Sequence, residues 1–583
     1  MKDLVAISPL WVSALTGLVA MALDLLTGSG RKSFLAWVVA IGLSLSAALG
    51  LALWRDPVIL SFPSLVAVLH LDFHGAFFGA LVALFGALAA LLAVPHLPEQ
   101  GIDEGETDAL LAFSAFGGQL LVVAVDLITL FLGLEVLSLS LYVLAASRRS
   151  SPFGAEAGLK YFLLGGVASG LLLLAAAFLY GATGSLDLRT ILDRLLAGSG
   201  GTDPTLAALA LVLILVALGF KVAAVPFHFW TPDVYQGSPP PVTGYMAGAV
   251  KAAAFAVLAR LLLTLWEVPA VAALGSRDVL LWLGILSVVV GSVLGVVQDD
   301  ARRILAWSSI VHAGYLLLGL WAVEPREGIG GLWTLNGSVP FYLLAYGIAS
   351  LGAFGALGVF ARGGHEDYRL ARLAGLGRGH PAATFVLMAS VLSLAGMPPL
   401  GGFLAKFRLF QHVVAVDSPW SIPAVVIAVL ASVVSLYYYL RILKVLYFDE
   451  PSEETAGHAS SPAAAFAMAA TVVASLVLGI VPTPFLDAGR RAAQGTVLAA
   501  GASLERVAAV ATPSPAPVSA PVRFGEGVVP PDARRPAPPV PVQVIRDAVG
   551  GYRPPEAPLD QERRRAPDGA RLMEVFRSPK ARP

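Results

Sequence analysis

The sequence predicts an all-α, polytopic membrane protein, and three observations support this fold class. Of the 583 residues, 57% are hydrophobic and only 13% are charged, whereas about 25% of the residues of an ordinary soluble domain are charged. Apolar runs of about 20 residues, long enough to cross a bilayer as helices, recur along most of the chain. Two of these runs are interrupted by Pro and Gly close to lysines.

Composition also excludes several classes of function. The formal net charge is zero, so no overall field favours a nucleic acid as a partner. The chain has no cysteine, which excludes disulfides, thiolate metal sites and iron-sulfur clusters within it. The first apolar run continues into a multi-span pattern and is therefore interpreted as a first span, not a cleavable signal.

We expect about fourteen membrane spans, arranged in blocks of different character. The stretch 108–145 is the hardest to divide, because Asp126 marks its only break. The expected spans are 9–27, 33–54, 72–94, 108–125, 127–145, 157–180, 205–229, 242–265, 279–297, 303–322, 338–360, 382–415, 421–446 and 462–484. They divide the chain into three N-terminal spans (1–107), a first repeat (108–265, helices 4–8), a second repeat (279–446, helices 9–13), a last span (462–484) and a tail (485–583).

Lys and Arg are enriched at alternate connections, which predicts the orientation. By the positive-inside rule the rich connections are cytoplasmic, so both termini are expected on the outer side. The residues of the rich set are Arg31, Lys32, Arg148, Arg149, Arg302, Arg303, Arg362, Arg369, Arg372, Arg378, Arg441 and Lys444.

The seventh and twelfth spans are expected to be broken helices. The first break lies at Pro226 in KVAAVPFHFWTP, and the second lies in GMPPLGGF, with Lys406 just beyond it. Proline removes a helical hydrogen bond, and the freed backbone groups then need partners in protein or water. Kinks filled by neighbouring helices are the alternative. The breaks lie five helices apart on the fourth helix of each repeat, a pattern that favours an ion path built from two repeats.

The tail is expected to be largely disordered. Residues 485–511 are rich in Ala and are compatible with an amphipathic or interfacial helix. From 512 to 583 the composition is rich in Pro, Ala and charge, which cannot bury a core. This segment either docks on a neighbouring protein or serves only as a tail, and we favour the second interpretation.

Several ionisable residues fall inside the expected spans. Glu135 lies in the middle of the fifth span, and Lys221 and Lys251 lie too far from helix ends to reach water easily. Burial disfavours the charged form of an amine, which makes a buried lysine able to release a proton. A carboxylate close to Lys221 would counteract this effect. We therefore interpret Glu135 and Lys221 as a charge pair that switches with distance.

Lys406 is expected to be the group from which the transported ion leaves the path. For each of the other candidates a purely structural role is a stronger alternative than it is for Lys406. His228 follows Lys221 by seven residues and would stack on the same helical face if the break permits, but a core histidine is an equal alternative. His312 lies in mid-helix and is expected to bridge the two halves. Lys160 follows Glu156 by four residues and also fits an ordinary salt bridge. No phosphate loop, dinucleotide fingerprint, metal cluster or nucleophile triad is evident, so the chemistry is limited to moving protons or small cations.

These residues lie in motifs that resemble the antiporter-like membrane subunits of respiratory complex I, the N type above all. The motifs are FLGLEVLSLSLYVLAA, EAGLKYFLLGG, GFKVAAVPFHFWTPDVYQGSPPPVTGYMAGAVKAAAF, QDDARRILAWSSIVHAGYLLLG and LSLAGMPPLGGFLAKFRLF, and the resemblance covers about residues 1–484. It implies fourteen core helices, two inverted five-helix repeats and a polar axis along the membrane midplane. Lys406 favours the N or L type because the M type usually has a glutamate there, and the lack of a long lateral helix favours N.

The resemblance also implies roles for the candidate residues. Glu135 resembles the family's buried glutamate and Lys221 its partner lysine, Lys251 resembles the central lysine and Lys406 the terminal one, and His228 and His312 resemble bridging histidines. The implied function is proton translocation coupled to NADH:quinone electron transfer. NADH, FMN, iron-sulfur clusters and quinone are then expected in other subunits, with M-type and small K, J and A-type subunits as neighbours in a bacterial inner membrane.

Two alternatives remain at this point. The same family core occurs in multisubunit sodium/proton antiporters and membrane-bound hydrogenases, which use another driving reaction. A structural spacer with vestigial charges is the second alternative. The complete set of Glu135, Lys221, Lys251 and Lys406 argues against the spacer, because unused charges in lipid are costly to keep.

Overall fold

The fold was determined as a computed structural model. It describes residues 5, 7–28, 32–54, 68–102, 104–198, 204–273, 275–325, 333–334, 337–360, 367–450 and 461–493. All of these residues belong to one compact unit, Met1–Pro513. The described residues end at 493. The Pro-rich part of the expected tail, 512–583, therefore lies outside them, as do residues 494–511 of the Ala-rich stretch. Arg31 and Arg362 of the set that predicts the orientation also lie outside them.

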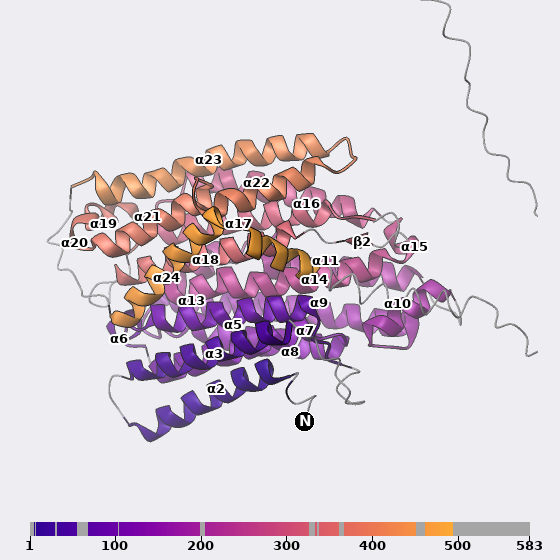
Figure 1. Cartoon of the computed structure of the whole chain (residues 1–583), viewed down its shortest axis with the longest axis horizontal. Coiled ribbons are helices and arrows are strands. Elements are labelled where there is room, and N and C mark those ends of the chain that lie inside the picture. Colours follow the sequence, from indigo (N-terminus) through magenta and orange to yellow (C-terminus); the bar gives the residue numbers. More distant parts are fainter. Residues whose placement is uncertain are drawn as a thin grey trace, which may run out of the picture. The chain divides into compact units, whose positions relative to one another are not determined.

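The described structure is almost entirely helical (Figure 1). Its only strands are β1 (Glu324–Pro325) and β2 (Trp333–Thr334), which pair antiparallel. The long helices are α2 (Ser8–Leu26), α3 (Ser33–Trp54), α5 (Phe73–Ala93), α7 (Glu104–Val123), α8 (Leu127–Ala145), α9 (Pro152–Thr183), α11 (Pro204–Val222), α14 (Lys251–Trp266), α16 (Ser276–Val296), α17 (Ala301–Trp321), α18 (Ser338–Val359), α21 (Pro381–Ala395), α22 (Gly401–Val414), α23 (Ser421–Tyr447) and α24 (Pro462–Ile480). The short helices are α6 (His96–Glu99), α10 (Leu188–Ala197), α12 (Thr231–Gly237), α13 (Pro240–Tyr245), the π-helix η1 (Met246–Val250), α15 (Pro269–Ala272), α19 (Leu370–Leu373) and α20 (Leu376–Gly379).

The number of spans agrees with the sequence prediction. Within the described residues, 13 helices are long and apolar enough to cross a membrane, and α21 is a shorter apolar helix. Together with α22, α21 forms the expected broken span, which accounts for the fourteenth. The chain is therefore a polytopic, all-α membrane protein. The helix α9 has 32 residues and is about 48 Å long, so it extends beyond a hydrocarbon core of about 30 Å.

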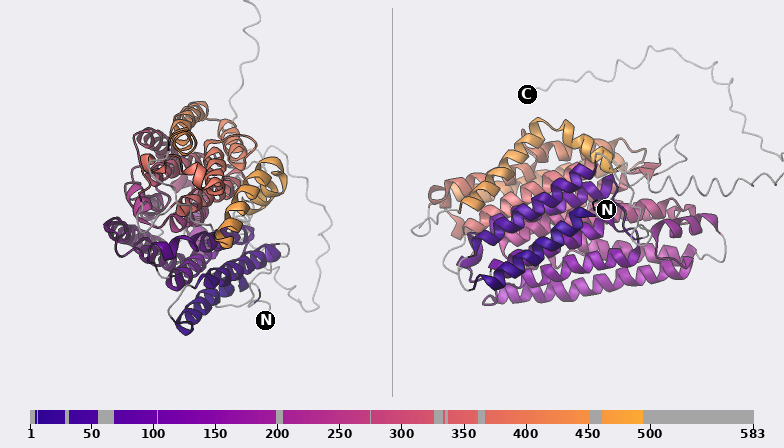
Figure 2. Two further views of the ribbon diagram at one scale, coloured as in Figure 1. Left: turned by 90° about the vertical axis from the view of Figure 1, so that its left-hand side faces the viewer. Right: turned by 60° about the horizontal axis from the view of Figure 1, so that its bottom comes forward.

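The bundle has a buried centre and a lipid-compatible periphery. The helices α14, α17 and α18 are almost entirely buried, and Figure 1 shows them between α2 and α23 at opposite edges. Figure 2 shows α2 and α3 side by side, in agreement with the contacts between them. The central helices are also those that carry Lys251 and His312, so the candidate residues lie where lipid does not reach.

One structural pattern occurs twice, once in each expected repeat. The residue before α8, Asp126, forms a β-bridge with Asp187, and the residue before α17, Asp300, forms one with Arg369. Each aspartate also caps its helix by accepting hydrogen bonds from two backbone N–H groups of the first turn. The stretch 108–145 is therefore divided at Asp126 as expected, and the pattern supports the predicted repeats, whose limits remain a prediction.

Both expected helix breaks are present. The helix α11 ends at Val222 and α12 begins at Thr231, while α21 ends at Ala395 and α22 begins at Gly401. Three residues before Pro226, Ala223 has a φ of 64°, and three residues before Pro399, Gly396 has a φ of 89°. L-residues such as alanine rarely adopt this left-handed conformation, so the surrounding structure holds the chain in it. The two interruptions are built in the same way.

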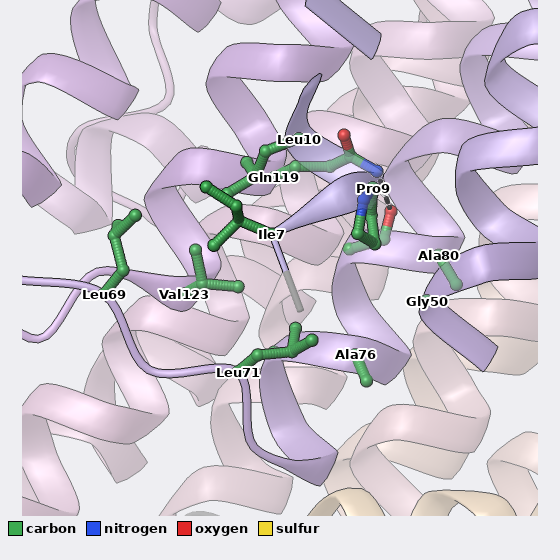
Figure 3. Close-up of a pocket in the computed structure, with 12 residues that line it drawn as sticks. Ile7, Pro9, Leu10, Gly50, Leu69, Leu71, Ala76, Ala80, Gln119 and Val123 are labelled. Atoms are coloured by element: carbon green, nitrogen blue, oxygen red, sulfur yellow. Dashed lines mark hydrogen bonds between the residues drawn. The ribbon is translucent and has the colours of Figure 1, made fainter. Parts of the chain in front are cut away.

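A small cavity lies between the start of α2 and the helices α5 and α7, away from the buried lysines (Figure 3). Its volume is about 20 Å³, which is room for about one water molecule. Apolar side chains such as Ile7, Leu71 and Val123 line it, with Gln119 as the polar exception. This cavity is a packing feature of the N-terminal helices.

The sequence analysis did not predict α10, and it predicted the helical segment 483–493 only in part. The helix α10 is amphipathic and buries Leu188, Ile191, Leu192 and Leu195, a spacing visible in the sequence but too short for the span criterion. Residues 483–493 are helical, and Gly489 lies against the backbone of Gly337 at the start of α18. This segment therefore packs on the bundle, in agreement with the amphipathic helix that was one of the two expectations for the start of the Ala-rich stretch.

Candidate functional site

Three lysine side chains from three different spans are buried in the bundle. Lys221, Lys251 and Lys406 are only 5%, 2% and 7% exposed. An ammonium group at the centre of a membrane costs at least about 2.5 kcal/mol, so these positions need compensating contacts. In each case hydroxyl or carbonyl oxygens accept hydrogen bonds from the amine, and an aromatic ring lies over it.

Lys221 is the last lysine before the first interruption and points toward α8 and α9. Its Nζ donates hydrogen bonds to Ser138 Oγ at 2.7 Å and to the Tyr161 hydroxyl at 3.4 Å. It lies 5.1 Å from the ring centroid of Tyr161 and 5.8 Å from that of Tyr142. The ring of Tyr161 in turn stacks on Trp230 with centroids 4.8 Å apart. Lys221 therefore lies in an aromatic cage with a hydroxyl at its tip.

Glu135 lies one turn before Ser138 on the same face of α8. It acts electrostatically on Lys221, but the structure shows no direct ion pair between the two residues. Its Oε1 is buried and has no hydrogen-bond partner among the described residues. The expected Glu135–Lys221 pair is therefore open in this structure, with the Ser138 hydroxyl in place of the carboxylate.

Lys251 follows the π-helix η1 directly at the start of α14. Its Nζ donates a hydrogen bond of 2.5 Å to the backbone carbonyl of Ser309 on α17. It also lies 5.6 Å from the ring centroid of Tyr346, whose hydroxyl donates to Ser309 Oγ at 2.8 Å. Single π-turns inside helices often occur at functional sites. Here the π-turn precedes the central lysine, which contacts the second repeat.

His312 on α17 lies between Lys251 and Lys406, and both ammonium groups act on it electrostatically. Its Nδ1 is 2.6 Å from the Tyr342 hydroxyl and its Nε2 is 3.4 Å from the Tyr439 hydroxyl. Both ring nitrogens are thus in contact with groups that can donate and accept protons.

Lys406 lies at the second interruption. Its Nζ donates to Ser432 Oγ at 2.8 Å and to the carbonyl of Ala395 at 3.1 Å, and it lies 5.3 Å from the ring centroid of Tyr315. Ala395 is the last residue of α21, so the lysine satisfies a carbonyl that the helix break leaves free. The amine therefore points back across the break.

His228 does not stack on Lys221 in the way that helical spacing suggested, because α11 ends at Val222. It lies in the turn before α12, is half-buried, and its ring centroid is 5.4 Å from that of Trp307. Its Nδ1 is buried without a partner among the described residues.

Lys160 forms the ion pair with Glu156 that its spacing predicted, at 2.5 Å. A second pair joins it to Asp233 on α12, also at 2.5 Å, and Arg303 on α17 binds the same carboxylate at 2.7 Å. Burial alone would raise the pKa of the Asp233 carboxyl, but the hydrogen bonds from Lys160 and Arg303 hold this pKa below its usual range. Lys160 therefore belongs to a cluster of charges that ties α9 and α17 to the first interruption.

Sequence reasoning missed the hydroxyl-bearing residues that surround the lysines. Ser138, Tyr161, Tyr342 and Tyr346 are not charged, and single hydroxyls in spans are common, so composition does not mark them. One signal was available, since Ser138 lies three residues after Glu135 and therefore on the same helical face. Among the described residues no group of three His, Cys, Asp or Glu side chains is arranged to hold a metal ion.

The site thus contains two groups of side chains that can exchange protons. Lys221 lies with Ser138 and Tyr161 beside the first interruption, and Lys251 and Lys406 both act electrostatically on His312. Amines, hydroxyls and an imidazole can donate and accept protons within each group. The fold and the site together define an antiporter-like, ion-translocating class of membrane protein.

Comparison with known proteins identifies the family within this class. Residues 124–433, more than half of the chain, match the family described as "NADH:quinone oxidoreductase/Mrp antiporter, TM". The chain belongs to this family. It is 40% identical over 509 residues to the NADH-quinone oxidoreductase subunit N 1 of Sorangium cellulosum, covering 84% of this chain and 98% of that protein.

Solved structures give the same picture. A chain of respiratory complex I from Thermus thermophilus with bound aureothin is 35% identical, with a TM-score of 0.66 over 83% of this chain and 99% of that one. A chain of the Mrp complex from Dietzia sp. DQ12-45-1b has a TM-score of 0.72 over 86% of this chain and 99% of that one. Its identity is 24%, so this second likeness concerns the fold.

Proposed function

We propose that this chain is the N-type, proton-translocating membrane subunit of an NADH-quinone oxidoreductase. It carries no redox centre of its own, and it couples electron transfer in other subunits to proton movement through its buried residues. The observation that carries the proposal is the burial of three lysines from three spans, two of which act electrostatically on His312. The 40% identity to a subunit N and the 35% identity to a complex I chain support it.

In the proposed mechanism the first step is a change in the distance between Glu135 and Lys221. When the carboxylate approaches, it stabilises the protonated amine, and when it withdraws, the buried amine releases its proton more easily. The open arrangement, with Lys221 bound to Ser138 instead, is the state in which release is favoured.

The proton then moves toward the second repeat. Lys251 accepts it, with His228 as an accessory group in the interruption, and His312 passes it on toward Lys406. The contacts of His312 with two tyrosine hydroxyls keep both ring nitrogens ready for transfer. Lys406 releases the proton to the outer side. Lys160 is an accessory member whose ion pair with Asp233 links the first repeat to the interruption.

The subunit is proposed to lie in the bacterial inner membrane with both termini on the outer side. Its proposed neighbours are an M-type antiporter-like subunit and small K, J and A-type subunits, with NADH, FMN, iron-sulfur clusters and quinone bound elsewhere in the complex. The alternative, a subunit of a sodium/proton antiporter or hydrogenase, shares the fold but has no specific observation in its favour.

The test is the Lys221→Ala variant in the assembled complex. NADH-quinone reductase activity should co-purify with the tagged chain, and the variant should lose proton pumping and coupled reductase activity while the complex stays intact. The Lys444→Ala variant is the control, because Lys444 is an exposed lysine in the last turn of α23. Normal pumping by the assembled Lys221→Ala complex would refute the assignment. A complex without reductase activity but with sodium-dependent transport would favour the antiporter alternative.

A further inference from the structure

Trp230 lies on the other side of the first interruption from Lys221, and its side chain reaches back across the break. It directly precedes α12 and is only 3% exposed. Its indole Nε1 donates a hydrogen bond of 3.0 Å to the backbone carbonyl of Phe220. Phe220 is the residue before Lys221 in α11. The indole therefore joins the two sides of the break at the residue next to the lysine.

The carbonyl that the indole binds has lost its ordinary helical partner. In a continuous α-helix the Phe220 carbonyl would accept a hydrogen bond from the N–H of Ala224. Ala224 donates to the carbonyl of Gly219 instead, at 2.8 Å. The Phe220 carbonyl accepts from the N–H of Ala223 at 3.0 Å and, with its second lone pair, from the indole. Trp230 thus completes the hydrogen bonding that the left-handed turn at Ala223 disturbs.

The ring of Trp230 also packs against the aromatic cage of Lys221. It stacks on Tyr161 with ring centroids 4.8 Å apart and an interplanar angle of 8°. Tyr161 is fully buried. Its ring centroid lies 5.1 Å from the Lys221 Nζ, and its hydroxyl accepts a hydrogen bond of 3.4 Å from this amine. Trp230 therefore contacts both the backbone that carries Lys221 and the ring that lies over the Lys221 amine.

The second interruption shows that a break of this kind does not require such a residue. Counted from the left-handed residue of each break, Phe403 takes the place that Trp230 has in the first break. Phe403 is 40% exposed, and its side chain has no N–H group to donate. The hydrogen bond across the second break comes from Lys406 instead. In the first break an uncharged side chain makes this link, which leaves the Lys221 amine free to bind Ser138 on α8.

We propose that Trp230 is a positioning residue for Lys221. The inference rests on the proposed function and concerns the geometry of its first step. The indole hydrogen bond fixes the end of α11, and the stacked ring fixes Tyr161, so that the Lys221 amine stays in contact with Ser138. Trp230 itself exchanges no proton in this role. A misplacement of reacting groups by about 1 Å can slow a reaction about 100-fold, so loss of the indole should stop proton transfer at Lys221.

The first experiment measures the number of protons pumped per NADH oxidised by the complete complex in membrane vesicles. Trp230→Leu removes both the N–H group and the ring, and its ratio should fall to that of Lys221→Ala. Trp230→Phe keeps a ring that can stack on Tyr161 and loses only the N–H group, so its ratio should lie between those of Trp230→Leu and the wild type. Any other order of the three ratios would overturn the proposal.

The matched control is Trp11→Leu. Trp11 is 51% exposed on α2, so its replacement should leave the ratio at the wild-type value. The ratio is measured only in complexes that have assembled, because a residue that merely stabilises the fold would change the yield or the melting temperature of the complex and not the ratio.

The second experiment observes the positioning directly, by electron cryomicroscopy of the assembled Trp230→Leu complex. We expect the Tyr161 ring to have turned and the Lys221 Nζ to have left Ser138 Oγ, from which it is 2.7 Å away in the present structure. An unchanged Tyr161 ring with the Lys221–Ser138 contact intact would overturn the proposal.

The experiments separate the role of Trp230 from the proposed function. A wild-type ratio in Trp230→Leu, with pumping lost in Lys221→Ala, would refute the positioning role alone. Normal pumping in Lys221→Ala would refute the proposed function.

Discussion

The amine of Lys406 donates a hydrogen bond of 3.1 Å to the carbonyl of Ala395, across the interruption of the twelfth span. Lys221 also lies beside an interruption, but on the preceding half-helix, and it binds a serine of another helix at 2.7 Å instead. The two broken helices therefore share their backbone construction and differ in which half carries the lysine. Lys406 thus joins the two halves of its own broken helix by a hydrogen bond. Lys221 instead joins the end of α11 to α8.

Lys406→Ala should abolish proton release from the second half of the relay. The variant loses hydrogen bonds from a charged group, worth about 1.5–3 kcal/mol each, but it also avoids the cost of burying a charge. We therefore expect a small change in stability, below about 2 kcal/mol, and normal assembly. Proton pumping in reconstituted vesicles is the measurement. Pumping equal to that of the exposed-lysine control Lys444→Ala would contradict the role.

Gly402→Ala should destabilise the second interruption without touching an ionisable group. A Cβ at this position would lie 1.8 Å from the carbonyl oxygen of Ser393, so α22 would have to shift away from α21. Overpacking of this kind costs about 1–3 kcal/mol. The melting temperature of the purified complex measures the effect, with Gly170→Ala as the control because nothing lies within 4 Å of its Cβ. Equal melting temperatures would show that the break tolerates a wider spacing.

Much of the fold was predictable because the membrane imposes simple rules. Apolar runs of fixed length gave the spans, and prolines close to lysines gave both interruptions. What the sequence could not show are contacts between residues far apart in the chain. The buried pair of Asp72 and Arg260 joins α5 to α14 across 188 positions, and each partner alone resembles an ordinary residue near a span end.

The burial of Lys221, Lys251 and Lys406 was predictable from the sequence, whereas their roles in a relay remain a prediction. The charged candidates could be found in the sequence because a charge inside a membrane span is costly. Their positions within the motifs indicated which span carries each of them. The position of His228 was not predictable from helical spacing, because the left-handed turn at Ala223 changes the direction of the chain. The Lys221–Ser138 contact depends on a hydroxyl from another helix, a residue type that occurs in many spans without any such role.

Asp72→Asn should destabilise the protein strongly at neutral pH. Arg260 donates to both carboxylate oxygens of Asp72, at 2.9 and 2.7 Å, and both side chains are buried. Removing the charge leaves a buried guanidinium unpaired, which costs about 3–5 kcal/mol. Burial alone would raise the pKa of Asp72, but Arg260 holds this pKa well below its usual range. The melting temperatures of the wild type and the variant measure the difference.

The pH dependence of this difference has a definite sign. A carboxyl group with a lowered pKa in the folded state contributes stability that is present above the unfolded-state pKa of about 3.9 and is lost as the pH falls through the folded-state pKa. The gap between wild type and Asp72→Asn should therefore not shrink as the pH is lowered from about 8 to about 5. His70, whose Nδ1 lies 3.5 Å from Asp72, would only add attraction when protonated. A gap that shrinks in this window would contradict the buried pair.

His312→Phe should interrupt the relay between Lys251 and Lys406 while keeping an aromatic ring in the space. The ring packs among Tyr315, Tyr342 and Tyr346, so phenylalanine preserves most of the packing, and the stability change should stay within about 1–3 kcal/mol.

The loss of both ring nitrogens removes the group that exchanges protons with the tyrosine hydroxyls, so pumping should fall as far as in Lys406→Ala. Tyr342→Phe removes only the hydroxyl at 2.6 Å from Nδ1 and should give a smaller loss, because the imidazole remains in contact with the hydroxyl of Tyr439. The ratio of protons pumped to NADH oxidised separates these outcomes. A larger loss in Tyr342→Phe than in His312→Phe would mean that the tyrosine, and not the histidine, carries the proton between the two lysines.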